Sequence, residues 1–225
     1  PQIMNPLDLE EVLTPAGIAV ILALTLLSIS VWYVIIAKTW SLVSVRRKVK
    51  ALSLKLMAVK SFDDMCDVVG RVPENPYTRT AEAGISCKVV LDSSEREFER
   101  PEYEEIVRTA LGKQLKRERL RLDSGLTQLA LAGSTAPFIG LLGTVSGIVS
   151  VMAGLGAGNG SVESVAGPIG ETLILTGAGI LTALPAVFAW GIFRRLAECE
   201  YVRLETFAES VHTFLVKDVM LFGHD

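Results

Sequence analysis

The sequence predicts an all-α membrane protein in which three transmembrane helices continue into long cytoplasmic helices. Half of the 225 residues are apolar and the mean hydropathy is +0.42, which is high for a soluble domain. The apolar residues gather in three segments, each long enough to provide the roughly 20 helical residues that cross a hydrocarbon core. All 22 Lys and Arg residues lie outside these segments.

The first predicted transmembrane helix covers residues 16–37 and follows a short N-terminal segment, residues 1–15. A cleavable signal peptide begins with basic residues and has an apolar core of about 7–15 residues. Here Asp8, Glu10 and Glu11 precede a longer apolar core. A permanent membrane anchor is therefore the better interpretation.

The distribution of basic residues predicts the orientation. Residues 1–15 and the link GAGNGSVES at 156–164 contain no Lys or Arg, whereas residues 38–128 and 194–225 contain all of them. The positive-inside rule then places the last two regions in the cytoplasm and the first two outside it. The cytoplasm is reducing, so free thiols are expected there. The cysteines of these two cytoplasmic regions are Cys66, Cys87 and Cys199.

The insert at 38–128 is predicted to be helical. Residues 38–69 continue the first transmembrane helix inward until the loop RVPENPYTR, with its two prolines, ends it. A second helix covers 77–91. A third begins at Pro101, has glutamates in its first turn and feeds directly into the second transmembrane helix at 129–155.

The tail at 194–225 continues the third transmembrane helix, which covers 165–193. Its apolar residues recur every three or four positions beside charged ones, which is typical of an amphipathic helix. Such a stripe either packs within one subunit or faces a ring of subunits around a cytoplasmic vestibule. The pattern alone does not distinguish these two arrangements. The stripe consists of Leu204, Phe207, Val211 and Phe214.

Small residues form stripes on the second and third transmembrane helices. Such stripes let helix backbones approach closely in lipid. The first stripe is Gly133, Pro137, Gly140, Thr144 and Gly147. The third helix has Thr172, Thr176, Gly179 and Ala183, and on an adjacent face Glu171, Ala178, Thr182 and Pro185. This sector is wider than one helix contact requires.

Glu171 is the only charged residue in the three apolar segments. A carboxylate at bilayer depth costs a few kcal/mol on insertion scales, so we expect Glu171 to face a polar pore or partner. The hydroxyls of Thr144 and Thr176 can donate and accept hydrogen bonds, so they can support a proton relay or a hydrated ion. Three alternatives stay open: Glu171 reaches water from near the outer end of its helix, the hydroxyls only bond to their own helix, and Pro185 only kinks it.

An enzyme is not expected. The two histidines, His212 and His224, lie in the tail, and no Cys/His pattern has metal-site spacing. The glycine-rich GLGAGNG is not followed by the Lys-Ser/Thr of a nucleotide-binding loop. Acidic residues balance the basic insert, which favours contact with lipid headgroups over nucleic acid. We therefore expect no cofactor, metal or nucleic acid.

Two stretches of the hairpin resemble a known family. LALAGSTAPFIGLLGTVSGIVSVM and GPIGETLILTGAGILTALPAVFAWGIFRR are similar to the hairpin of the MotA/TolQ/ExbB proton-channel family, and the resemblance covers roughly residues 130–195. The three-helix layout with an outer N-terminus and a large cytoplasmic insert is similar to the ExbB/TolQ branch. The MotA branch is expected to have a fourth transmembrane helix.

The resemblance implies a homopentameric ring in the bacterial inner membrane, with a periplasmic N-terminus and a cytoplasmic C-terminus. The ring would enclose the single transmembrane helices of a smaller protein similar to ExbD or TolR. In the family, an Asp of that partner carries the proton and ring residues line its path. The matching motif assigns this lining role to Thr144, Thr176 and Glu171.

The implied function is conversion of the proton motive force into motion of a periplasm-spanning protein similar to TonB or TolA. Uptake through the outer membrane is the favoured process. A TolQ-type role in outer-membrane integrity and a non-conducting scaffold are the alternatives, and the transported ion is H⁺ or Na⁺.

Overall fold

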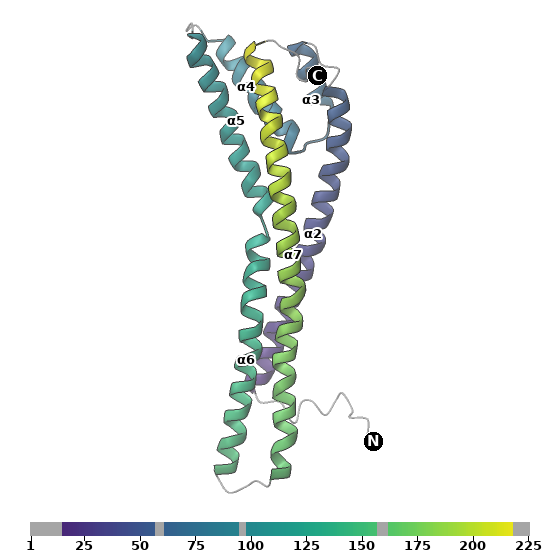
Figure 1. Cartoon of the computed structure of the whole chain (residues 1–225), viewed down its shortest axis with the longest axis vertical. Coiled ribbons are helices and arrows are strands. Elements are labelled where there is room, and N and C mark those ends of the chain that lie inside the picture. Colours follow the sequence, from purple (N-terminus) through teal and green to yellow (C-terminus); the bar gives the residue numbers. More distant parts are fainter. Residues whose placement is uncertain (1–14, 57–60, 95–97, 157–161, 218–225) are drawn as a thin grey trace. The chain divides into compact units, whose positions relative to one another are not determined.

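The computed structural model describes residues 15–56, 61–94, 98–156 and 162–217. Within these ranges all regular structure is α-helical, as the sequence predicts (Figure 1). Three helices are long and apolar enough to cross a membrane. The helices are α2 (Pro15–Leu56), α3 (Phe62–Arg71), α4 (Pro76–Asp92), α5 (Arg100–Asp123), α6 (Leu126–Gly156) and α7 (Val162–Lys217).

The chain divides into two compact units, and α2 and α7 each contribute to both. The apolar unit contains the described residues up to Ala37 together with Gly125–Phe193. The charged unit contains Lys38–Ser124 and the described residues from Arg194 onward. The boundary between the two units falls where the first and third apolar segments of the sequence end, at Lys38 and Arg194.

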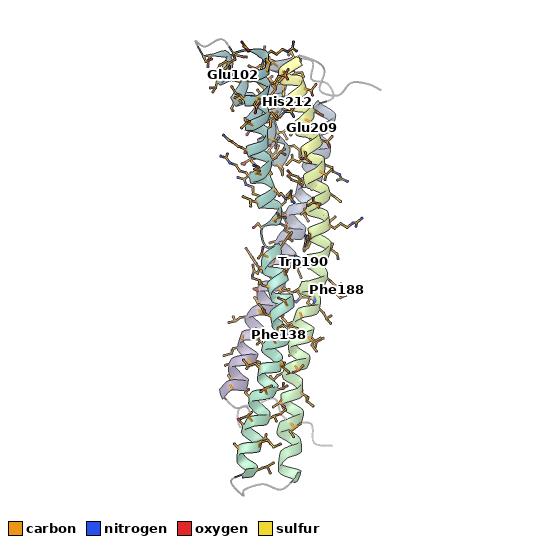
Figure 2. The ribbon with its side chains drawn as sticks, turned by 60° about the vertical axis from the view of Figure 1, so that its left-hand side comes forward. Glu102, Phe138, Phe188, Trp190, Glu209 and His212 are labelled. Atoms are coloured by element: carbon orange, nitrogen blue, oxygen red, sulfur yellow. The ribbon has the colours of Figure 1, made fainter. Side chains whose placement is uncertain are left out.

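The apolar unit has small residues inside and large apolar side chains outside. Val20 and Leu24 of α2 pack against Ala136 of α6 and against Leu175 and Ala183 of α7. Two aromatic side chains labelled in Figure 2, Phe138 of α6 and Phe188 of α7, are each 69% exposed. This inverted pattern is typical of helices whose outer surface contacts lipid or other transmembrane helices.

The charged unit has a conventional apolar core formed by α3, α4, α5 and the second half of α7. The ring of Tyr77 in α4 meets the edge of Phe207 in α7 at a centroid distance of 5.2 Å. The predicted tail stripe packs within this chain, because all four of its members are buried in this core: Leu204, Phe207, Val211 and Phe214.

Two predictions about how the helices are connected are wrong. The first transmembrane helix does not continue to residue 69, because Ser61 begins a separate helix, α3. The Ser61 side chain accepts a hydrogen bond from the Asp64 backbone N–H at 3.2 Å and caps the new helix. In addition, α5 does not feed directly into α6, because Gly125 separates them with a φ of +80°, a conformation that favours glycine.

The other predicted elements differ less. The helix expected at 77–91 is α4, which follows a capping box formed by Asn75 and Thr78. The helix expected from Pro101 begins one residue earlier in α5. The predicted outer N-terminus, except its last residue, and residues 157–161 of the predicted link lie outside the described residues.

Candidate functional site

Glycines bring the backbones of α6 and α7 into contact in the apolar unit. A Cβ atom added to Gly140 would lie 2.6 Å from the Leu175 carbonyl oxygen, and one added to Gly179 would lie 2.6 Å from the Ala136 carbonyl oxygen. Real Cβ atoms essentially never approach so closely. Only glycine therefore fits at these two crossing points.

The contact extends along both helices in antiparallel register. Gly133 faces Val187, and Gly147 faces the methyl group of Thr172. The structure therefore brings together four glycines that the sequence placed in packing stripes, because Gly140 and Gly179 lie between these two contacts.

The two prolines of the predicted site are less buried than the glycines of this contact. Pro137 and Pro185 are half-buried within α6 and α7. Ala136, the neighbour of Pro137, is fully buried. The sequence also missed Gly143, where an added Cβ would meet Leu175 and Val20. Gly143 follows Gly140 at the helical spacing of three, so the pattern contained a usable signal.

The hydroxyls of Thr144 and Thr176 meet across this contact. Thr176 Oγ1 donates to Thr144 Oγ1 at 3.4 Å, and Thr144 Oγ1 donates to the Leu141 carbonyl oxygen at 2.7 Å. Thr144 is only 5% exposed, whereas Thr176 is half-buried. The result is a directed chain of hydrogen bonds from a partly open hydroxyl to a buried one. Each hydroxyl can both donate and accept, so this pair can pass a proton or contact a hydrated ion.

Glu171 lies in α7, but its side chain is outside the described part of the structure. Its backbone position precedes Thr176 by five residues. At 3.6 residues per turn, this spacing places the two residues about 140° apart around the helix. Glu171 and Thr176 therefore occupy different faces of α7.

The charged unit contains a buried carboxylate that the sequence analysis did not identify. Glu118 in α5 has a side chain only 1% exposed. It accepts two hydrogen bonds from Arg79 in α4, at 2.8 and 2.6 Å, and a third from Gln114 at 2.8 Å. Hydrogen bonding to Glu118 raises the pKa of Arg79. This bidentate pair fastens α4 to α5.

A second buried carboxylate fastens α4 to α7. The hydroxyl of Tyr77 donates to Glu200 Oε1 at 3.0 Å, and Glu200 is buried. Burial, followed by the neighbouring Glu200, raises the pKa of Tyr77 well above its ordinary value. The sequence signal was the spacing: Glu200 lies between Ala197 and Leu204 on the buried stripe of α7.

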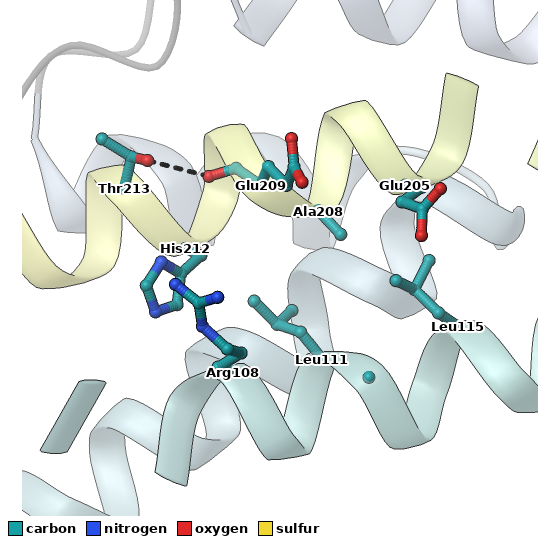
Figure 3. Close-up of a pocket in the computed structure, with 9 residues that line it drawn as sticks. Arg108, Leu111, Leu115, Glu205, Ala208, Glu209, His212 and Thr213 are labelled. Atoms are coloured by element: carbon teal, nitrogen blue, oxygen red, sulfur yellow. Dashed lines mark hydrogen bonds between the residues drawn. The ribbon is translucent and has the colours of Figure 1, made fainter. Parts of the chain in front are cut away.

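A cavity of about 380 Å³ lies between α5 and α7 in the charged unit (Figure 3). Arg108 and His212 line it together with Glu205 and Glu209, above an apolar floor that includes Leu111. The ring nitrogen Nε2 of His212 lies 3.2 Å from the Glu104 carbonyl oxygen. Among the described residues no cluster of His, Cys, Asp and Glu could hold a metal ion. The rim of this cavity carries charges of both signs.

Comparison with known proteins identifies the family. Residues 75–206 match the MotA/TolQ/ExbB proton channel family. The biopolymer transport protein ExbB of Xanthomonas campestris is 32% identical over 212 residues, which cover 87% of this chain and 79% of that protein. ExbB of Neisseria meningitidis is 30% identical over 212 residues, covering 90% and 93% of the two chains.

A relative with a different name is similar to a shorter part of this chain. The Tol-Pal system protein TolQ of Pseudomonas aeruginosa is 38% identical over 106 residues, which cover 47% of this chain and 46% of that protein. The similarity to ExbB thus extends over most of the chain, and the family match includes the α6–α7 hairpin with both threonines. The chain therefore belongs to the MotA/TolQ/ExbB proton channel family.

Proposed function

We propose that this protein is the ring-forming subunit of an inner-membrane proton motor. Five copies surround the transmembrane helices of an ExbD- or TolR-like protein, and proton flow drives motion of the ring relative to those helices. A TonB-like protein passes the motion to the outer membrane and energises uptake there. The observation that carries this proposal is the hydrogen bond between Thr176 and Thr144 on facing apolar helices.

The pair suits a proton path because two hydroxyls on facing helices lie within hydrogen-bonding distance of one another. Thr176, being half-buried, is the member that contacts the path from the partner side. Thr144 accepts its hydrogen bond and holds it in one orientation through Leu141. Glu171, on another face of α7, is the third residue of the path. Buried hydroxyls need hydrogen-bond partners, and Thr144 and Thr176 have them here.

The composition of the apolar segments supports a partner protein. These segments contain a single carboxylate, Glu171, and in the proposed mechanism the partner supplies the second protonatable group. One proton that crosses about 100 mV supplies about 2.3 kcal/mol from the potential. Substantial mechanical work therefore takes several protons.

The orientation proposed for the ring follows the basic residues. All Lys and Arg lie in 38–128 and 194–225, and the positive-inside rule therefore supports a cytoplasmic charged unit and C-terminus with a periplasmic N-terminus. Protons then enter from the side of the α6–α7 link and leave toward the charged unit.

Two other functions have specific support. A TolQ-type role in outer-membrane integrity is favoured by the 38% identity to TolQ, which is higher than the identity to ExbB but covers a shorter part. A non-conducting scaffold is favoured by hydroxyls that bond within their own helix, as Thr172 does to the Ile169 carbonyl oxygen at 2.8 Å.

The test separates these functions in two steps. The full chain is isolated from native membranes in mild detergent, and mass spectrometry identifies the proteins that accompany it. A single-span protein with an intramembrane Asp supports the motor, and the associated periplasmic protein distinguishes a TonB-type from a TolA-type system. Recovery of the chain alone, after crosslinking in energised cells, supports the scaffold.

The second step replaces hydroxyls without changing side-chain shape. Thr144→Val and Thr176→Val are expected to abolish energised function while the ring still assembles. Thr135→Val is the matched control, because Thr135 lies on the same helix, is exposed and bonds only to the Leu131 carbonyl oxygen at 2.7 Å among the described contacts. Full activity in either of the first two variants would remove that residue from the path.

A further inference from the structure

A second cavity, of about 370 Å³, lies within the charged unit where α2, α4 and α5 meet. Its volume is within the range of small-ligand sites. α2 contributes Trp40, Ser41 and Ser44, while Arg79 comes from the start of α4 and Arg121 from the end of α5. Glu74, just before α4, and the buried Glu118 complete its charged groups.

The cavity lies close to the ends of apolar segments along the chain. Trp40 follows the first apolar segment by three residues, and its side chain is 77% exposed. Tryptophan is enriched at the level of lipid headgroups, where its ring is apolar and its N–H reaches polar groups. Arg121 precedes α6, the second membrane-spanning helix, by five residues. Along the chain, the lining residues from α2 and α5 thus lie close to apolar segments that can span a membrane.

The charges lining the cavity balance, with two guanidinium groups and two carboxylates. Both carboxylate oxygens of Glu118 already accept hydrogen bonds from Arg79. Among the described contacts, Arg121 uses only Nη1, at 3.2 Å from Glu118, and Glu74 uses only Oε1, at 3.2 Å from Arg79. The other guanidinium nitrogens of Arg121 and the second carboxylate oxygen of Glu74 can therefore bind a ligand that carries both a negative and a positive charge.

We propose that this cavity binds the headgroup of a zwitterionic phospholipid that has a primary ammonium group. Arg121 binds the phosphate, because a guanidinium fork matches phosphate oxygens. Glu74 accepts from the ammonium, and the ring of Trp40 covers the glycerol region. A neutral lining disfavours lipids with net negative charge, and a trimethylammonium group cannot donate to Glu74. This lipid site is independent of the proton path in the apolar unit.

The test uses the full chain in uncharged detergent, with Trp32→Phe and Trp190→Phe so that Trp40 is the only tryptophan. Dihexanoyl phosphatidylethanolamine is expected to change the Trp40 fluorescence saturably. Dihexanoyl phosphatidylcholine and phosphatidylglycerol should bind at least tenfold more weakly. O-phosphoethanolamine, the headgroup without its lipid, should also bind at least tenfold more weakly.

Variants assign the contacts. Arg121→Gln should weaken phosphatidylethanolamine binding at least tenfold, and Arg121→Lys should restore part of it. Glu74→Gln should remove the preference over phosphatidylcholine. Arg119→Gln and Glu82→Gln are matched exposed controls outside the cavity and should bind like the parent. Unchanged binding in Arg121→Gln, equal binding of free O-phosphoethanolamine, or tighter binding of phosphatidylglycerol would each overturn the proposal.

Discussion

Replacing Gly140 by alanine should destabilise the protein by forcing α6 and α7 apart. The added Cβ would lie 2.6 Å from the Leu175 carbonyl oxygen and 3.0 Å from the Thr176 Cα atom. Ordinary van der Waals contact begins at 3.4 Å, so the closer pair is short by 0.8 Å. Both obstacles are backbone atoms, which cannot rotate away as a side chain can. The helices have to separate by this order of distance.

The expected cost is about 1–3 kcal/mol, the usual range for overpacking. For a chain of this size, each kcal/mol lowers the melting midpoint by about 2–4 °C, so we expect a decrease of about 2–12 °C. The assay is thermal unfolding of the purified full chain in detergent. Gly179→Ala should behave similarly, because its Cβ would meet the Ala136 carbonyl oxygen at 2.6 Å.

Two comparisons test the reasoning. Gly177→Ala is the matched control on α7, because nothing lies within 4 Å of its added Cβ, and its midpoint should not fall. The double variant Gly140→Ala/Gly179→Ala should cost less than the sum of the single changes, since one separation of the helices relieves both clashes. Equal midpoints for Gly140→Ala and the parent would refute the idea that glycine is required at this contact.

Three further predictions concern the charged unit and its border. Glu118→Ala should cost about 1–3 kcal/mol, because Arg79 loses the bidentate partner that joins α4 to α5 and, among the described contacts, keeps only Glu74. Denaturant unfolding measures this cost, and a midpoint equal to the parent's would refute it. Stability should fall as pH rises above about 10, the ordinary pKa of tyrosine, because the unfolded chain ionises there while burial and Glu200 keep Tyr77 protonated when folded. Tyr77→Phe should therefore lose part of this alkaline decrease in melting midpoint, and an identical pH profile would contradict the assignment. Gly125→Ala should lower the free energy of unfolding by about 1 kcal/mol, because Gly125 has a φ of +80°. An unchanged free energy in the same unfolding assay would show that this turn does not need glycine.

The transmembrane architecture was predictable because hydropathy is a property of whole segments. Three long apolar runs and the placement of all basic residues between and after them are visible without any contact. The break at Ser61 was not visible, because residues 38–69 are rich in good helix formers. A single capping hydroxyl, together with burial of Met65 and Val69 in the core of the charged unit, decides it.

The small-residue stripes were predictable in spacing but not in exact phase. Pro137 and Ala136 both fit a spacing of three or four from their neighbours, and only the structure shows that Ala136 is the buried one. Glu118 was missed for a similar reason, because the run KQLKRERLRL is charged on most faces. Its phase becomes clear only when Leu111 and Leu122 are seen to be buried.

The glycine contact and the hydroxyl pair are parts of one arrangement. Gly140 lies one turn from Thr144 on α6, and Gly179 lies three residues after Thr176 on α7, so the close approach of the backbones sets the 3.4 Å distance between the hydroxyls. A separation of several tenths of an ångström would take this contact beyond hydrogen-bonding distance. Loss of function after a glycine substitution would therefore not distinguish packing from proton transfer. Threonine-to-valine substitutions do distinguish them, because they keep the shape that the glycines create and remove only the groups that can pass a proton.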